Sequence, residues 1–133
     1  MTSLVLRLAP NERVLINGAV IENSDRRTKI TITTPDVQVL RLRDAMHPDE
    51  AKTPVTRTYY IAQMIQTGEM DLAEGRKKLL AAIEQLSQVF EDHDSRRLLK
   101  EATECVIEGK TYSVMRRMRD LMPREARLFA ISQ

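Results

Sequence analysis

The fold class of this chain is decided first by residues 14–21, which read Val14-Leu15-Ile16-Asn17-Gly18-Ala19-Val20-Ile21. An Asn-Gly pair between two apolar runs is the strongest short-range signal of a β-hairpin, because both turn residues must accept a positive φ. On either side of this stretch, short apolar runs and turn residues continue to alternate as far as residue 43. The sequence therefore predicts antiparallel β-structure over the N-terminal third of the chain.

Five short strands are expected in this region. In the first strand, a period-two pattern places Leu4, Leu6 and Leu8 on one face. The fourth strand is favoured by the β-branched run of residues 30–33. The simplest assembly is an antiparallel meander in chain order within residues 1–46. Its strands are expected at residues 4–8, 14–16, 19–21, 30–33 and 37–42.

The period of the apolar residues becomes helical after Met46. Thr53-Pro54 predicts the start of a first helix, because proline disfavours helical geometry in the preceding residue and is itself welcome at the first helical position. This helix is expected to run to about Gln66 and to end near Gly68. Asp71, with Glu74 three residues later, resembles the capping box of a second helix.

A third helix is expected to begin at Asp92 or Asp94 and to end at Gly109, where a left-handed residue is favoured. A fourth apolar stripe then runs up to Pro123, and residues 124–131 are expected to form a short fifth helix. The predicted fold class is α+β. A five-stranded antiparallel β meander in residues 1–46 precedes a bundle of four to five helices in residues 47–133.

Composition favours a folded protein in a reducing compartment. Of the 133 residues, 42% are hydrophobic and 30% are charged, which separates the chain from disordered sequences. Cys105 is the only cysteine, so an intramolecular disulfide is excluded. No apolar run approaches the roughly 20 residues of a membrane span, and the N-terminus lacks the features of a signal peptide. A cytoplasmic protein with no membrane partner is expected.

The charge is unevenly distributed. The net charge is only +2, yet residues 109–133 hold six Lys or Arg against two Asp or Glu. A basic C-terminal segment suits an anionic partner. The same residues would equally pair with the acidic helices that precede them in the chain. Composition leaves both interpretations open.

Sequence motifs of catalysis are absent. The chain has no glycine-rich phosphate loop, no nucleophile elbow and no helical pair of histidines. His47 and His93 lie far apart without further ligand spacing, and Cys105 is expected to be a packed thiol. We therefore expect no enzyme activity, no catalytic residue, no metal site and no cofactor.

Two groups of residues are candidates for binding. Arg7 on the first strand, with Arg41 and Arg43 on and after the fifth, would place guanidinium groups beside an apolar strip that can hold RNA phosphates and bases. The alternative is an ordinary solvated sheet face. The second group would bind a protein partner through a Met-rich basic helix, with core packing as the alternative. It consists of Tyr112, Met115, Arg116 and Arg119.

Three segments in this order and spacing resemble the FlbT family, the flagellum biosynthesis repressors of alphaproteobacteria. They are Ile16–Ile21, Thr53–Ile65, and Val106–Tyr112 continuing through Met115 to Leu121–Ala126. The resemblance implies a post-transcriptional regulator that associates with the 5′ untranslated region of flagellin mRNA and promotes its degradation. It implies no catalytic residues, and the sign of regulation stays open because some relatives act positively.

A shorter resemblance concerns the strands alone. Thr34–Arg41 is similar to the fourth turn and fifth strand of the CsrA carbon-storage regulators, apart from one residue fewer after the proline. In that family an arginine two positions after the second strand valine contacts RNA, and Arg41 occupies this place. The RNA groove of those dimers joins the first strand of one subunit to the fifth of the other. The resemblance implies that Arg7, Arg41 and Arg43 line such a groove.

The leading hypothesis is therefore a binder of the flagellin mRNA leader, with salt-sensitive affinity. The alternative is a flagellin-binding chaperone or an adaptor for another flagellar regulator, in which amphipathic helices hold a partner helix. The low net charge fits this alternative slightly better. A homodimer formed through exposed strand edges is compatible with either function.

Overall fold

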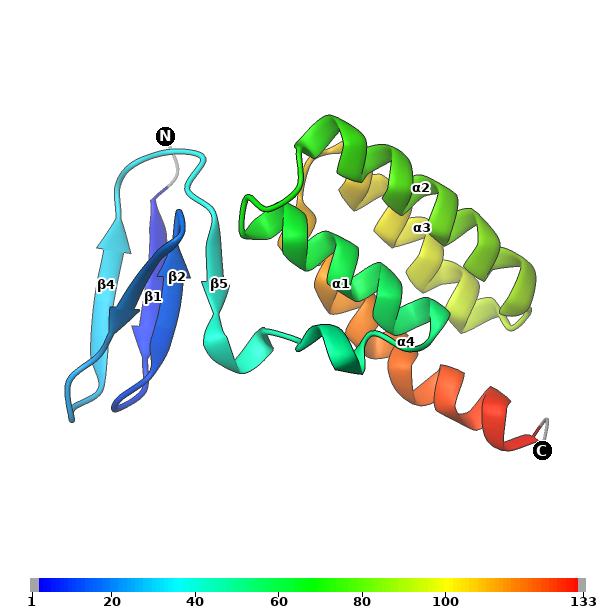
Figure 1. Ribbon diagram of the computed structural model, residues 1–133, viewed down its shortest axis with the longest axis horizontal. Coiled ribbons are helices and arrows are strands. Elements are labelled where there is room, and N and C mark those ends of the chain that lie inside the picture. Colours follow the sequence, from blue (N-terminus) through cyan, green and yellow to red (C-terminus); the bar gives the residue numbers. More distant parts are fainter. Residues whose placement is uncertain (1–2, 132–133) are drawn as a thin grey trace. The chain divides into compact units, whose positions relative to one another are not determined.

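The computed structural model of the protein describes residues 3–131 (Figure 1). The chain forms two compact units, which are here called the β unit (Met1–Ala45) and the helical unit (Met46–Gln133). Strands occupy the first unit and α-helices the second. The predicted α+β class, with antiparallel strands before a helical bundle, is confirmed.

The β unit contains five strands in two antiparallel sheets. One sheet pairs β1 with β4, and the other has the order β3-β2-β5. The pairing thus differs from a meander in chain order, in which β1 would pair with β2. The two-sheet arrangement buries Leu6, Leu8 and Val14 in one cluster, whereas a single small sheet would leave one face in water. The strands are β1 (Leu4–Leu8), β2 (Arg13–Ile16), β3 (Ala19–Glu22), β4 (Thr28–Ile32) and β5 (Val39–Arg41).

The hairpin predicted from Asn17-Gly18 is confirmed. Asn17 has φ 49° and Gly18 has φ 84°, so both turn residues are left-handed, and Ile16 is paired with Ala19 across the turn. β5 is shorter than expected. Its predicted end at residue 42 is replaced by a 3-10 turn, η1 (Leu42–Asp44).

The helical unit contains four α-helices and a preceding 3-10 turn, η2 (Pro48–Glu50). The caps predicted at Thr53 and Asp71 are confirmed, and of the two candidates for the third helix the cap is Asp92, because each of these side chains accepts a hydrogen bond from a backbone N–H of the first helical turn. The Glu74 side chain pairs with Lys78, so the capping box predicted from Asp71 and Glu74 is reduced to its Asp71 half. Gly109, with φ 75°, follows the end of the third helix as predicted. The helices are α1 (Pro54–Gln66), α2 (Leu72–Val89), α3 (His93–Ile107) and α4 (Thr111–Ile131).

α4 continues through Pro123 as a single helix, where the sequence predicted a break. Proline has no N–H, so the carbonyl group four residues earlier loses its helical hydrogen bond. The residues after Pro123 are instead fixed by side-chain contacts with other helices: Arg124 bonds to Asp94 of α3, and Glu125 to the start of α1. These tertiary contacts offset the cost of an internal proline, of about 3 kcal/mol.

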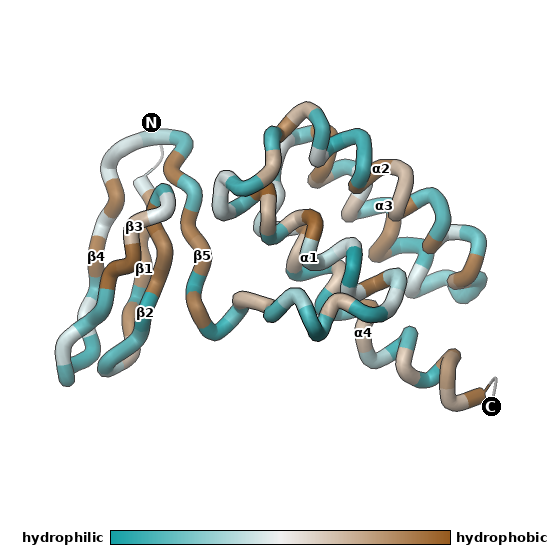
Figure 2. The backbone as a smooth tube through the Cα atoms, in the orientation of Figure 1, coloured by the Kyte–Doolittle hydropathy of each residue, from teal (hydrophilic) through white to brown (hydrophobic). Residues whose placement is uncertain are grey.

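Apolar side chains from all four helices form the core of the helical unit. In Figure 2 hydrophobic and hydrophilic residues alternate along each helix, as expected when one face is buried. Tyr59 and Phe90 are the aromatic members of this core, with exposed fractions of 1% and 2%. Met115 and Met118 are also buried, so these two methionines fill space in the core.

Gly75, in the first turns of α2, lies against the buried Ile65 of α1. A Cβ added at position 75 would overlap the Ile65 side chain and approach the Met70 sulfur at 3.3 Å. Gly75→Ala should gain about 1 kcal/mol of helix propensity and lose about 1–3 kcal/mol by overpacking. We expect a net destabilisation in urea unfolding. The control is Ala81→Gly, at an exposed position of the same helix, which should lose only the propensity.

Candidate nucleic-acid interface

The outer face of the β1–β4 sheet carries two basic side chains directly opposite each other. Arg7 of β1 is paired with Lys29 of β4, next to the uncharged pair Val5 and Thr31. The alternating residues Leu6 and Leu8 of β1 point to the core, so Arg7 and Lys29 point away from it and are exposed. Neither side chain forms an ion pair with any residue in the part of the chain that the structure describes.

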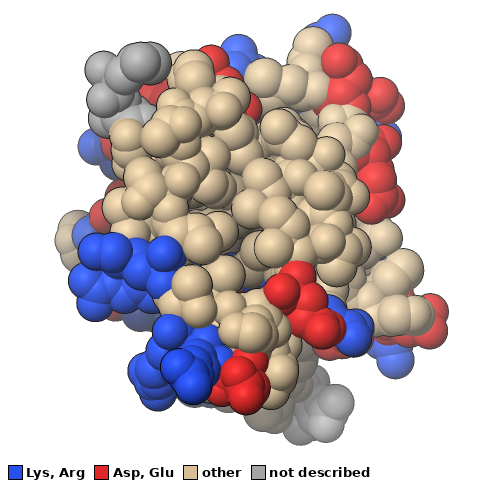
Figure 3. All heavy atoms as spheres, turned by 90° about the vertical axis from the view of Figure 1, so that its left-hand side faces the viewer, with Lys and Arg blue, Asp and Glu red and all other residues tan. Residues whose placement is uncertain are grey.

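Two further arginines precede Lys29 by two and three residues, in the connection from β3 to β4. The buried side chain of Asn23 donates to the carbonyl groups of Ala9 and Arg26, at 2.8 Å each. These bonds hold the connection against the end of β1, and Arg26 and Arg27 are left exposed. Figure 3, a view onto the β unit, shows Lys and Arg side chains gathered below a broad uncharged area, with a few Asp or Glu side chains beside them. We call Arg7, Arg26, Arg27 and Lys29 the basic face.

The role of Asn23 was not predicted from the sequence. The only local signal is its place in Asn23-Ser24-Asp25, three residues of the kind that favour turns. Its bonding partners Leu8, the last residue of β1, and Ala9 lie 15 and 14 residues earlier in the chain. Which side of the sheet the turn packs against was therefore not visible in the sequence.

Arg41, a predicted RNA ligand, is engaged inside the β unit. Its Nη1 donates to the Glu12 carboxylate at 2.7 Å and to the Arg7 carbonyl group at 3.1 Å. The Arg41 and Glu12 side chains are only 16% and 8% exposed. The other oxygen of Glu12 accepts from the N–H of Ala9 at 2.9 Å. The bond from Arg41 to the Arg7 carbonyl group links β5 of one sheet to β1 of the other, and the ion pair with Glu12 holds Arg41 in this position.

The pKa of Glu12 reflects these contacts. Burial raises the pKa of its carboxyl group, but other contacts outweigh burial and leave the pKa below its ordinary value of 4.5. They are the hydrogen bonds from the Ala9 N–H and from Arg41, together with the positive charges of Arg41 and Arg43. Arg43 itself lies in η1 and is exposed, so its charge is available at the surface.

The four residues proposed for partner binding on α4 have different environments. Met115 is 1% exposed and belongs to the core. Arg119 donates to the hydroxyl oxygen of Tyr59 at 2.5 Å, and its Cζ lies 5.2 Å from the centre of that ring. Tyr112 and Arg116 are exposed and lie one helical turn apart. The structure thus brings Tyr112 and Arg116 together at the surface and uses Met115 and Arg119 in contacts within the helical unit.

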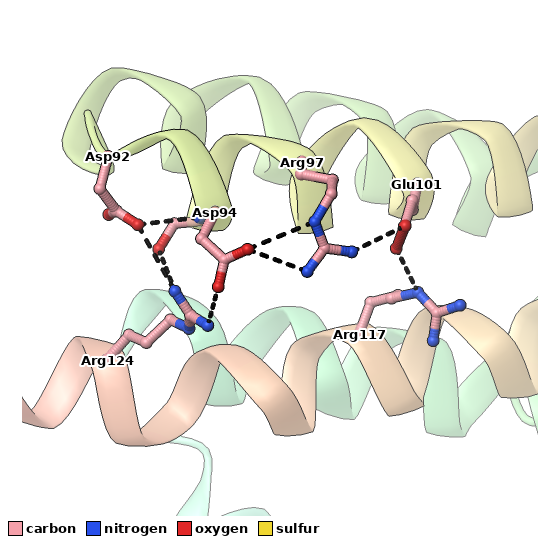
Figure 4. A network of polar contacts seen from close by, with 7 residues as sticks. Asp92, Asp94, Arg97, Glu101, Arg117 and Arg124 are labelled. Atoms are coloured by element: carbon pink, nitrogen blue, oxygen red, sulfur yellow. Dashed lines mark hydrogen bonds and ion pairs between the residues drawn. The ribbon is translucent and has the colours of Figure 1, made fainter.

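Part of the basic charge of α4 pairs with acidic residues of α3 (Figure 4). Arg124 contacts Asp94 at 2.6 Å and Asp92 at 3.4 Å, and Arg117 contacts Glu101 at 3.1 Å. The hydrogen bond from Arg124, followed by that from Arg97, lowers the pKa of Asp94. For Arg117 and Arg124, this pairing supports the interpretation that the basic residues of the C-terminal segment pair with acidic helices of the same chain.

A buried carboxylate joins α4 to the start of α1. Glu125 is 7% exposed. One of its oxygens accepts from the Thr53 hydroxyl at 2.5 Å, and the other accepts from the Val55 N–H at 2.9 Å. Glu125 therefore satisfies a backbone donor at the N-terminus of α1 that the helix itself cannot satisfy, and its negative charge is favourable there.

α2 and α3 border a groove of about 420 Å³. Its floor is apolar, with Leu80, Ile83 and Leu99, and its rim carries Arg96 and Lys100 beside Glu84. Leu99 and Ile83 belong to the buried core. Such a groove has the residue types that accept one face of an amphipathic helix.

Within residues 3–131, no group of three or more His, Cys, Asp or Glu side chains is placed to hold a metal ion. The same residues include no helix of the length and apolarity needed to cross a membrane. The candidate binding features of the described residues are the exposed basic side chains on the β unit and the groove on the helical unit. These features define a small α+β protein with surfaces suited to binding.

The chain belongs to the FlbT family, since residues 4–129 match the family described as "Flagellar protein FlbT". A "Probable flagellum biosynthesis repressor protein FlbT" of Mesorhizobium japonicum is 32% identical over 94% of this chain and 84% of its own length. The protein of the same name from Rhodopseudomonas palustris strain TIE-1 is 31% identical over 96% of this chain and 98% of its own length. No solved structure shows comparable similarity.

Proposed function

We propose that this chain represses flagellin synthesis in the cytoplasm by binding the 5′ untranslated region of flagellin mRNA and promoting its degradation. The broad part of this function follows from the family. Relatives at about 30% identity over nearly the whole chain are named probable flagellum biosynthesis repressor proteins, so the chain is a regulator of flagellum biogenesis, which is not an enzymatic role. The binding of RNA is the finer part of the proposal and rests on the basic face.

The observation that carries this proposal is the pair Arg7 and Lys29. Like charges directly opposite each other on two strands destabilise a sheet. Here the two cations are exposed and lack a counter-ion among the described residues. A phosphate group bound between them would remove the repulsion and replace it with two charge-assisted contacts. Arg26 and Arg27 would extend the contact along the backbone of a single strand.

The chemistry of the β unit also limits how RNA would be recognised. Residues 1–45 contain no aromatic side chain, so bases cannot stack on aromatic rings of this unit. Contact with bases would fall to arginine side chains, whose planar guanidinium groups stack on bases and bond to their edges. We therefore expect affinity that depends mainly on phosphate contacts and decreases steeply with salt.

The test is the affinity of the double variant Arg7→Ala/Lys29→Ala for the flagellin mRNA leader, measured by fluorescence anisotropy at several salt concentrations. Removing both cations should weaken binding at least about tenfold. The salt slope, which is the slope of the logarithm of affinity against the logarithm of salt concentration, should fall in magnitude by about 0.7 for each phosphate that is no longer neutralised. The matched control is Lys77→Ala/Lys78→Ala, which removes the same charge from the exposed side of α2. Equal affinity of the double variant and the wild type would exclude the pair Arg7 and Lys29 from the RNA site and remove the observation on which the proposal rests.

The groove between α2 and α3 favours a second candidate function, a flagellin-binding chaperone or an adaptor for another flagellar regulator. An amphipathic helix would place apolar side chains over Leu80 and Ile83 and an acidic side chain near Lys100. Such binding would be largely salt-tolerant because apolar contact supplies most of its energy. Salt-tolerant binding of flagellin without binding of the mRNA leader would favour this function over the first.

A further inference from the structure

β3 is an edge strand of unusual composition within the β unit. All four of its residues are exposed, and Val20 has an exposed fraction of 65%. In Figure 2 most of β3 is coloured as hydrophobic. Its sequence, Ala19-Val20-Ile21-Glu22, contains no proline and no lysine, and its only charge, Glu22, is paired with Arg13 of the neighbouring β2 at 2.7 Å. The edge therefore lacks the proline, the lysine and the unpaired charge that commonly protect an edge strand against pairing with another strand.

The other sheet edges of the unit differ from β3. Arg7 is the last but one residue of β1 and Lys29 is the second residue of β4, and both charges oppose the addition of a further strand. β5 has only three residues. β3 is thus the edge that offers uncharged backbone for pairing.

The backbone groups at this edge can be identified from the hairpin. Ile16 and Ala19 flank a two-residue turn and exchange hydrogen bonds, and the N–H of Asn23 donates to Glu12 at 2.9 Å. Hydrogen-bonded pairs alternate along an antiparallel ladder, so Ile21 is the bonded residue between them. The N–H and C=O groups of Val20 and Glu22 consequently point to the free edge.

The geometry points to a homodimer in which β3 pairs antiparallel with β3 of a second copy, Ile21 lying opposite Ile21 of that copy. In this register Val20 pairs with Glu22 of the second copy, and Glu22 with its Val20. All four backbone groups at the edge of each copy are then hydrogen-bonded. Ile21 and its counterpart, each 38% exposed, cover one another beside the buried Val14.

A second copy fits this edge better than an unrelated strand because the segment is complementary to itself. If Glu22 instead of Ile21 lay opposite its own counterpart, two glutamates would face each other, which is unfavourable. If Val20 lay opposite its own counterpart, the backbone groups of Glu22 would be left unpaired. The proposed register opposes Glu22 with the apolar Val20 and brings no like charges together. This inference does not depend on RNA binding.

The first test is the mass of the full chain in sedimentation equilibrium over a wide concentration range, for the wild type and two variants. Val20→Glu places a carboxylate opposite Glu22 of the other copy, and the dimer contains two such pairs of like charges. We therefore expect loss of the dimer. Val20→Lys places an ammonium group there, so we expect the dimer to persist. Val89→Glu, at a 58% exposed position of α2, is the control. Circular dichroism checks that each variant is folded.

The second test is crosslinking in a chain with Cys105→Ser. Residues opposite each other in a non-hydrogen-bonded antiparallel pair have Cα atoms about 4.5 Å apart, within the range of a disulfide. Ile21→Cys should therefore give a covalent dimer under mild oxidation. Val20→Cys should not, because the two introduced thiols would be offset by two residues, roughly 8 Å between Cα atoms.

Three results would overturn the proposal. The first is a wild-type chain that remains monomeric at all concentrations. This result would overturn the proposal even if the β3 edge then bound a strand of another protein. The second is a dimer that survives Val20→Glu. The third is crosslinking of Val20→Cys as readily as Ile21→Cys. Each of these outcomes leaves the test of RNA binding unaffected, since that test measures the affinity of the basic face.

Discussion

Glu125→Ala is expected to lower the free energy of unfolding of the helical unit by about 2–4 kcal/mol. The carboxylate accepts hydrogen bonds from Thr53 and Val55, so its removal leaves the buried N–H of Val55 without its partner, while the Thr53 hydroxyl keeps its contact with Thr56. It also removes one of the contacts that hold α4 after Pro123. Urea unfolding measures the loss, and hydrogen exchange should show faster opening at the start of α1.

Two further variants serve as comparisons for this prediction. Glu125→Gln keeps one acceptor oxygen and should lose less stability than Glu125→Ala. Glu104→Ala removes an exposed glutamate of α3 and should stay within about 0.5 kcal/mol of the wild type. If Glu125→Ala unfolds at the same urea concentration as Glu104→Ala, Glu125 has no capping role.

Arg41→Ala is expected to destabilise the β unit by about 2–3 kcal/mol, because it leaves the Glu12 carboxylate largely buried and without its cation. Hydrogen exchange of the β-unit amides measures the loss. The double variant Glu12→Ala/Arg41→Ala should lose less than Arg41→Ala alone, since no unpaired charge is left behind. Arg13→Ala breaks the exposed pair with Glu22 and should cost no more than about 1 kcal/mol.

Acid provides an independent check on the same ion pair. The pKa of Glu12 is lowered by folding, so the stability it contributes is present above its ordinary pKa of 4.5 and is lost as the pH falls through the lower folded value. The β unit of the wild type should therefore weaken below about pH 4.5 more than that of Glu12→Gln. Equal acid sensitivity of the two chains would contradict the assigned role of Glu12.

A further experiment separates a structural role of Arg41 from a role in RNA binding. The resemblance of Thr34–Arg41 to the CsrA regulators implies a phosphate contact for Arg41. Its bonds to Glu12 and to the Arg7 carbonyl group favour a structural role instead. If the structural role is correct, Arg41→Ala should bind the mRNA leader with nearly the wild-type salt slope at a temperature where the β unit stays folded.

The local features of this protein could be predicted from the sequence. The Asn17-Gly18 turn, the Thr53 cap and the left-handed Gly109 depend on residues within a few positions of one another. The family resemblance was also visible in the sequence, because the three segments that carry it are read in order along the chain. The strands and helices, and the α+β class, follow from the same local patterns.

Contacts between distant residues were decided by the tertiary structure. The pairing of β1 with β4 follows from burial of Leu6, Leu8 and Val14 in one cluster, which period-two patterns in single strands do not specify. Glu125 caps a helix that begins about 70 residues earlier in the chain, and this contact decides that α4 continues past Pro123.

The same division applies to the candidate sites. The sequence by itself determined which residues are basic and that Arg7 lies on a strand. The tertiary structure decided that Arg41 is engaged by Glu12 while Arg7 and Lys29 meet without a counter-ion among the described residues. It also decided that Met115 lies in the core. The physical reason is that a side chain's availability depends on the charges and apolar surfaces packed around it, and most of these come from remote parts of the chain.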